Sequence, residues 1–211
     1  MLQLDHLTVL APTLAEGVAH VRAQLDIDVP FGRQHVDMGT HNHLLRLGDS
    51  IYLEIIAVNP QAPPPGRPRW FGLDDQTALR AAWDSGRRLR GWVARTDDID
   101  ALLQRHAASL GRKVTLSGST PFCFAIPDDG ALPLDGAAPS VIDRLGKPPA
   151  VATMADAGAR LRTVILDHPD AARIAMLYRD LGVIDAPEVR HGAQLRYRAV
   201  IETPRGLREL T

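Results

Sequence analysis

The 211-residue chain is poor in cysteine, in aromatic residues and in excess charge of either sign. Its single cysteine, Cys123, excludes an intramolecular disulfide and suits a reducing compartment. The formal net charge of −1 excludes the basic field that nucleic-acid binding needs. No apolar run approaches the roughly 18 residues of a membrane span, and the N-terminus has no basic region of a signal peptide. We therefore expect a cytoplasmic protein without nucleic-acid or membrane partners.

What the chain does contain is an alternation of strand and helix patterns. Residues 2–10 alternate apolar and other side chains as a strand does, and Thr13 with Glu16 forms a capping box that predicts a helix start. Short strands are then expected near residues 33–38 and 41–47, followed by the apolar strand 51–57. The first part of the chain is thus predicted to be a β-α-β-β-β unit.

The same order of elements returns twice. We place the three modules at approximately residues 1–58, 87–145 and 160–211 within a single domain 1–211, with a proline-rich loop at 59–73. That loop is expected to be a surface connection, with a lid as the alternative. Repeated βαβββ units predict an α+β fold in which curved sheets form an open cup, and the concave face of the cup is the expected ligand site.

The choice of partner modules depends on an internal repeat. Residues 10–27 align with residues 166–183 without a gap, through the helix entry, the apolar positions and the exit. We therefore expect modules one and three to form the cup, while the middle module covers an edge.

Candidate site residues follow from the strand alternation. In 51–57, Tyr52 and Glu54 share a face opposite Leu53 and Ile55, so they are expected to face the cup. The other residues expected to contact a ligand lie on the neighbouring strands or at the cup mouth: His6, Thr8, His35, Thr40 and Asn42. A structural ion pair of Glu54 with Arg46 or Arg162 is the alternative to a functional role.

The sequence also resembles a known family, the glyoxalase-like domain group of the vicinal oxygen chelate (glyoxalase, bleomycin resistance and dioxygenase) superfamily. The matching segments are LDHLTVLAPTLAEG (4–17), GTHNHLLRLGDSIYLEII (39–56), LRGWVARTDDIDA (89–101) and, more loosely, PSVID (139–143). The resemblance covers most of the chain and implies the vicinal oxygen chelate fold. It also implies metal-dependent lyase, isomerase or dioxygenase chemistry as the broad class.

In metal-using members one ligand comes from the first strand of a module and another from its last strand, which here are His6 and Glu54. The resemblance implies one divalent ion (Zn, Mn, Ni or Fe(II)) on this pair, with Glu202 or Glu209 as the candidate third ligand. Gly91 and Arg162 align with His6 in the later modules, and neither replaces a histidine. The second half of the metal site is therefore not visible, and a site without metal is the alternative.

Two functions remain open on the sequence. The first is an enzyme that binds a small oxygenated metabolite in the cup, with Glu54 as the catalytic residue that moves a proton. The second is a small-molecule binding or sequestration protein of the resistance type, with neither turnover nor metal. Under both, the expected partner is a small-molecule ligand, and a homodimer through strand edges is an option.

Overall fold

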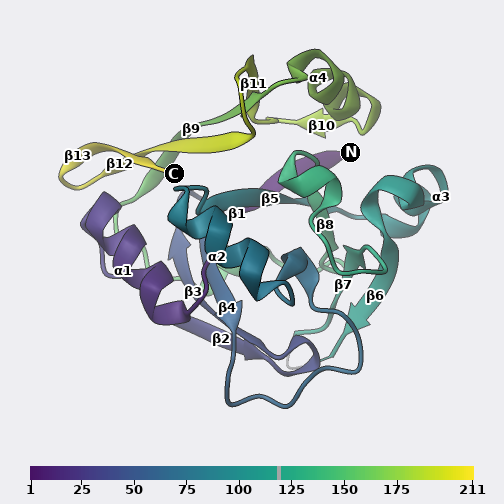
Figure 1. The fold of residues 1–211 in the computed structure, drawn as a ribbon, viewed down its shortest axis with the longest axis horizontal. Helices are drawn as coiled ribbons and strands as arrows, with labels where there is room; N and C mark the ends of the chain where they lie inside the picture. The colour runs from purple at the N-terminus through teal and green to yellow at the C-terminus, as the bar shows by residue number, and fades with distance from the viewer. Residues whose placement is uncertain (118–119) are drawn as a thin grey trace.

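The computed structural model describes residues 1–117 and 120–211. In this part of the chain the strands form two sheets, a large curled sheet and a smaller four-stranded sheet that lies across it (Figure 1). The large sheet has the order β2-β3-β4-β1-β5-β8-β7-β6, and the short strand β10 also pairs with β1. The small sheet has the order β11-β9-β12-β13.

Four α-helices connect these strands: α1 (Leu14–Leu25), α2 (Gln76–Asp84), α3 (Ile99–Leu110) and α4 (Ala171–Asp180). The first seven strands are β1 (Leu2–Leu10), β2 (Phe31–His35), β3 (Thr40–Arg46), β4 (Tyr52–Val58), β5 (Leu89–Thr96), β6 (Arg112–Leu116) and β7 (Phe122–Ile126). The remaining strands are β8 (Ser140–Asp143), β9 (Arg160–His168), β10 (Val183–Ile184), β11 (Glu188–His191), β12 (Arg196–Thr203) and β13 (Gly206–Leu210). None of the described helices is both long and apolar enough to cross a bilayer.

Helices α1, α3 and α4 begin at a capping side chain that accepts a backbone hydrogen bond. The side chain of Thr13 accepts a hydrogen bond from the backbone N–H of Glu16, and Asp98 and Asp170 accept equivalent bonds at α3 and α4. Each cap satisfies one of the N–H groups that the first turn of a helix leaves free. The predicted start of α1 is thus confirmed.

Two βαβββ modules build the large sheet, and they are the first and the middle one. In the first module β1 pairs in parallel with β4, and in the middle module β5 pairs in parallel with β8. Strands β1 and β5 then join the two halves as an antiparallel pair. The α+β fold of repeated modules around a curved sheet is confirmed, but the expectation that modules one and three form the cup is wrong.

The third module forms the small sheet and differs in topology from the other two. Its first strand, β9, pairs with β11 and β12 rather than with the last strand β13. The module packs over β5, where the indole Nε1 of Trp92 donates to the hydroxyl of Tyr178 and the two rings meet edge to face. A backbone bond from Leu161 to Leu47 ties β9 to the first module. The similar patterns of residues 10–27 and 166–183 therefore predict local helices but do not predict which strands pair.

The two faces of the large sheet carry different cores. On one face, residues such as Leu53, Ile55 and Trp92 belong to a continuous apolar core with α1, α3 and the third module. On the other face, Ile56 and apolar residues of the middle module pack with Trp70 and Phe71. The segregation of Leu53 and Ile55 from Ile56 confirms the predicted alternation of this strand.

Trp70 and Phe71 end the proline-rich loop, and they are 3% and 4% exposed. Their rings are tilted against one another, and Phe124 of β7 contacts Trp70 in a tilted geometry and Phe71 edge to face, so this part of the loop packs into the cup. The expectation of a simple surface connection is therefore wrong at the end of the loop, because two large aromatic side chains gain more from burial than from solvent contact.

Candidate functional site

A β-bulge in β1 positions the centre of the site. The pairing of β1 with β5 shifts register between Leu4 and His6, so Asp5 is an extra residue on the bulged strand. Such a bulge re-aims side chains. Leu2 and Leu4 consequently join the core on the helix side, whereas the sequence alternation places them on the His6 face. The guanidinium of Arg95 holds the bulge by donating to the carbonyl oxygen of Leu4, 2.9 Å away.

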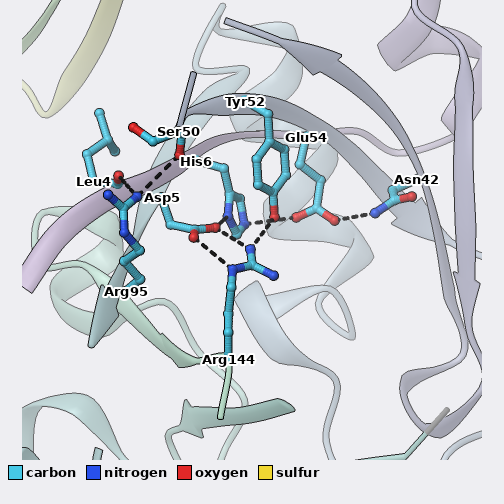
Figure 2. Close-up of polar contacts among 9 residues, drawn as sticks. All are labelled: Leu4, Asp5, His6, Asn42, Ser50, Tyr52, Glu54, Arg95 and Arg144. Atoms are coloured by element: carbon cyan, nitrogen blue, oxygen red, sulfur yellow. Dashed lines mark hydrogen bonds and ion pairs between the residues drawn. The ribbon is translucent and has the colours of Figure 1, made fainter. Parts of the chain in front are cut away.

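His6 lies between two carboxylates (Figure 2). Its Nδ1 is 2.7 Å from Oδ1 of Asp5, and its Nε2 is 3.4 Å from Oε2 of Glu54. The other Glu54 oxygen, Oε1, accepts a hydrogen bond of 2.6 Å from the side-chain amide of Asn42. All four residues are at least 95% buried. The predicted structural partners of Glu54 are wrong, because Arg46 pairs with Asp49 and Arg162 pairs with Glu202.

Arg144, which belongs to the middle module, completes this group of buried polar contacts. Its Nε and Nη2 donate to the two oxygens of Asp5 at 3.0 and 2.5 Å, a bidentate geometry that a planar guanidinium favours. Nη2 also donates to the hydroxyl of Tyr52, 3.1 Å away. The ring of Tyr52 stacks on His6 with 4.5 Å between the ring centroids. The first and middle modules are therefore joined by a buried polar network, drawn in Figure 2.

The pKa values of this network favour its charged forms. Burial alone would raise the pKa of Glu54, but the hydrogen bond and charge of His6, together with Asn42, lower it to about 2. Burial alone would lower the pKa of His6, but Asp5 and Glu54 raise it above its usual value. The His6 and Arg144 contacts likewise outweigh burial and lower the pKa of Asp5. These shifts favour the imidazolium form of His6 between the two carboxylates.

The network opens into a small cavity of about 20 Å³, bounded by His6, Tyr52, Glu54 and Asn42 and by residues of the middle module. The volume suits one water molecule or the oxygen of a ligand. Three residues of its lining, Arg33, Phe122 and Arg144, also line a second, open cavity of about 690 Å³. The buried array therefore lies at the inner end of a larger groove.

His35 and Thr40 lie on the same side of the cup. His35 lines the small cavity, and its Nδ1 is 3.1 Å from Oγ1 of Thr40. Its ring meets Trp70 edge to face, and burial lowers the pKa of His35 to about 4, so the imidazole is neutral at pH 7. The five buried side-chain atoms without a hydrogen-bond partner among the described residues include the hydroxyl oxygen of Thr8 and Nε1 of Trp70. Of these two residues, Trp70 lines the cavity.

The structure thus brings His6, His35, Asn42, Tyr52 and Glu54 to one cavity. Thr40 supports His35 from behind, and Thr8 lies beside Glu54 in the strand register. Their roles as ligand-binding or catalytic residues remain predictions.

The third-module carboxylates do not join the site. Glu202 and Glu209 lie on β12 and β13 of the small sheet, where Glu202 pairs with Arg162 and Glu209 is exposed. The proposal that one of them completes a metal site across the cup is therefore wrong, because the small sheet is not the partner of β1 and β4.

A divalent ion at His6 and Glu54 would need further ligands from the middle module. When the two modules are aligned at their helix caps, Thr13 and Asp98, the residue of the middle module that corresponds to His6 is Gly91. In the first module Thr8 pairs with Glu54. In the middle module the residue equivalent to Thr8 is Val93, which pairs with Ser140, so Ser140 occupies the position of Glu54.

Neither Gly91 nor Ser140 supplies the imidazole or carboxylate that such an ion needs. Within residues 1–117 and 120–211, no group of three or more His, Cys, Asp or Glu is placed to hold a metal. The guanidinium of Arg144 lines the same cavity and repels a cation. The residues present therefore do not fit a resident divalent ion, and the metal assigned to His6 and Glu54 remains an untested prediction.

Sequence reasoning missed Asp5 and Arg144. Arg144 follows strand β8, and the alternation of Ser140 and Ile142 extended by one step would have directed it into the cup. Asp5 gave no such signal, since regular alternation places it on the opposite face from His6 and only the bulge brings the two together.

One family model and several solved structures are similar to this chain. The family model described as "Glyoxalase-like domain" matches residues 4–182. A solved hypothetical protein from Staphylococcus aureus is similar over 100% of this chain and 99% of its own, with 11% identity and a TM-score of 0.62. A methylmalonyl-CoA epimerase from Mycobacterium tuberculosis is 18% identical over 72% of this chain and 91% of its own, with a TM-score of 0.39.

A Streptomyces coelicolor methylmalonyl-CoA epimerase, solved with 2-nitronate-propionyl-CoA, is 18% identical over 68% of this chain and 98% of its own, with a TM-score of 0.40. No curated protein matches the sequence.

Proposed function

Because the chain belongs to the glyoxalase-like domain family, we propose that it binds a small oxygenated metabolite in the cup and moves a proton on it, as an isomerase or lyase does. The observation that carries the proposal is the position of Nε2 of His6, 3.4 Å from the carboxylate of Glu54 in the lining of one cavity. Buried groups with opposed pKa shifts in a cleft are typical of acid–base sites.

The proposed step uses both groups. The carboxylate of Glu54 accepts a proton from a carbon next to a carbonyl group, and the electron pair of that C–H bond forms the C=C bond of an enol. The carbonyl oxygen meanwhile takes a proton from Nε2 of His6, so no net charge develops on the ligand. Return of the two protons, on the same or another carbon, completes an isomerisation and restores both groups.

Ligand binding would also raise the pKa of Glu54, the proposed base. The His6 contact is the main favourable influence that holds the pKa of Glu54 near 2. A carbonyl oxygen that accepts the hydrogen bond of His6 competes with this contact, so the pKa of Glu54 rises toward a value suited to proton abstraction. Asp5 keeps His6 oriented throughout, because its bond to Nδ1 does not involve the ligand.

Deuterium exchange tests the proposal. The protein is incubated in D2O with a panel of ketones and 2-oxo acids, and proton NMR follows exchange at the carbon next to the carbonyl. We expect Glu54→Gln to slow exchange roughly 100-fold or more, the range for loss of a general base. The matched control is Glu209→Gln, which removes an exposed carboxylate of the third module. Equal rates for wild type and Glu54→Gln would overturn the proposed step.

A second function, binding without turnover, is favoured by one observation. A carboxylate whose pKa lies near 2 and whose two oxygens already contact His6 and Asn42 is a weak base. Under this alternative a ligand raises the melting temperature, is recovered unchanged, and takes up no deuterium beyond the rate without protein.

A further inference from the structure

The open groove that leads to the site is lined by two cations, Arg33 and Lys147, that have no carboxylate partner among the described residues. Its volume of about 690 Å³ lies within the range of about 300–1,000 Å³ that is usual for small-molecule sites. Strand β2 forms one wall, and residues 144–155 with the start of β7 form the other. The lining includes Arg33, Arg144 and Lys147 but no Asp or Glu.

The cationic side chains of the groove have N–H groups that make no hydrogen bond to the described residues. Arg33 makes no side-chain hydrogen bond or ion pair with any residue in the described ranges. The ammonium of Lys147 donates to the carbonyl oxygen of Pro121, at 3.1 Å, and has no carboxylate partner there. Arg144 uses Nε and Nη2 for Asp5 and Tyr52, which leaves Nη1 without a partner among the described residues. An anionic ligand would satisfy these donors.

Two of these cations lie where the groove meets the small cavity. Arg33 and Arg144 line both spaces, whereas Lys147 lines the groove alone. An anion held between the two guanidinium groups would lie where the groove meets the cavity that His6 and Glu54 line, and the ligand atoms next to the anion would be the nearest to that cavity.

The rest of the groove is apolar. Phe31 is 54% exposed in its wall, and Leu44, Phe122 and Met154 lie in the same lining. An aromatic side chain in contact with water gains free energy when an apolar group covers it. The groove thus combines a cationic inner end with an apolar channel that leads to solvent.

We propose that the ligand is an amphipathic carboxylate, whose head binds between Arg33 and Arg144 and whose apolar tail lies along the groove beside Phe31. This inference rests on the proposed function for the position of the reacting carbon, which lies on the tail side of the carbonyl carbon next to the head. A carboxylate is the natural head group, since the guanidinium of Arg33 presents a planar fork that matches two oxygens and Nη1 of Arg144 adds one further donor. The site therefore selects an oxo acid with a chain of several carbons over a neutral ketone or a short acid.

Calorimetry with matched probes tests this ligand class. The probes are 2-oxooctanoate, 2-octanone, pyruvate and octyl phosphate, which vary the head and the tail separately. We expect 2-oxooctanoate to bind at least roughly tenfold more tightly than each of the others, because only it fills both parts of the site. Tighter binding of octyl phosphate would overturn the carboxylate assignment, and equal binding of 2-octanone would overturn the anion site.

Variants locate the two parts. Arg33→Met should weaken 2-oxooctanoate roughly 10- to 100-fold, the range for a hydrogen bond to a charged group, without changing the melting temperature. Phe31→Ala should weaken 2-oxooctanoate but leave pyruvate unchanged. Arg22→Met is the control, since Arg22 is an exposed arginine on α1 that pairs with Asp28. Unchanged affinity in Arg33→Met would overturn the proposal.

The outcomes separate this inference from the proposed function. If 2-oxooctanoate binds with the expected dependence on Arg33 but takes up no deuterium, the ligand class stands and the proton transfer fails. If 2-octanone exchanges as fast as 2-oxooctanoate and Arg33→Met has no effect, the proton transfer stands and the ligand class fails.

Discussion

Nε2 of His6 lies 3.4 Å from Oε2 of Glu54, and both side chains are more than 90% buried. The pair makes the stability of the protein depend on pH in a specific direction. The pKa of His6 in the folded protein is raised above its usual 6.5, so its contribution is fully present below pH 6.5. It is lost as the pH rises through the raised value.

We therefore predict that the free energy of unfolding falls as the pH increases above 6.5, by about 1.4 kcal/mol for each unit by which the pKa is raised. Denaturant titrations across this range measure the slope. His6→Gln should flatten it. The histidines with lowered pKa values, His20, His35 and His41, give the opposite slope and act below pH 6.5. A wild-type stability that rises through neutral pH would contradict the charged state of His6.

The second prediction concerns the bond between the modules. Arg144→Met leaves the carboxylate of Asp5, whose side chain is 1% exposed, without its bidentate partner. Loss of one partner from a buried ion pair costs about 3–5 kcal/mol of unfolding free energy. Arg46→Met is the matched control, because Arg46 pairs with the exposed Asp49 and such pairs contribute about 0–1 kcal/mol. Equal losses in the two variants would show that the buried pair has no special role.

The third prediction concerns the docking of the third module. The hydroxyl of Tyr178 donates to the carbonyl oxygen of Ala137 at 2.7 Å and accepts from Trp92 at 3.3 Å. Tyr178→Phe leaves both groups buried without a partner, at about 1–3 kcal/mol each. Tyr197→Phe removes the hydrogen bond from the Tyr197 hydroxyl to the carbonyl oxygen of Gly136, at 2.8 Å, and should cost less. Thermal unfolding of both variants measures the order, and the reverse order would contradict this assignment.

The fourth prediction concerns metal. Because Gly91 and Ser140 occupy the positions of a second half-site, Zn, Mn, Ni or Fe(II) should bind well below one equivalent after dialysis. Elemental analysis of protein without a histidine tag measures this. Any residual metal should be unchanged in Glu54→Gln. Stoichiometric metal that Glu54→Gln abolishes would restore the metal site that the family resemblance implies.

The sequence predicted local structure better than long-range pairing. The alternation in 51–57 correctly directed Tyr52 and Glu54 to the cup, because a regular strand fixes which side chains share a face. It failed in β1, where the bulge at Asp5 changes the face of every residue before it. A bulge is set by pairing with β5 and by contacts such as that of Arg95, which no local pattern contains.

The choice of partner modules failed for a related reason. Matching helix patterns at 10–27 and 166–183 report amphipathic helices with similar caps, which both modules have. They carry no information on which strand edges meet. Arg144 comes from the module that does meet β1, and it was missed because that module was expected only to cover an edge. His6, Asn42, Tyr52 and Glu54 of the first module were placed at the cavity correctly because they lie on neighbouring strands, whereas Asp5 was missed because of the bulge.

The third module supplies none of the residues that bound the small cavity, yet it alters the groove. Residues 144–155 leave β8 at one end and lead to β9 at the other, and β9 is fixed by the bond from Leu161 to Leu47. A chain that ended after β8 would leave Lys147 and its neighbours as a free tail with many conformations. Tethered at both ends, this segment loses most of that freedom during folding, so a ligand meets a wall that it does not have to order.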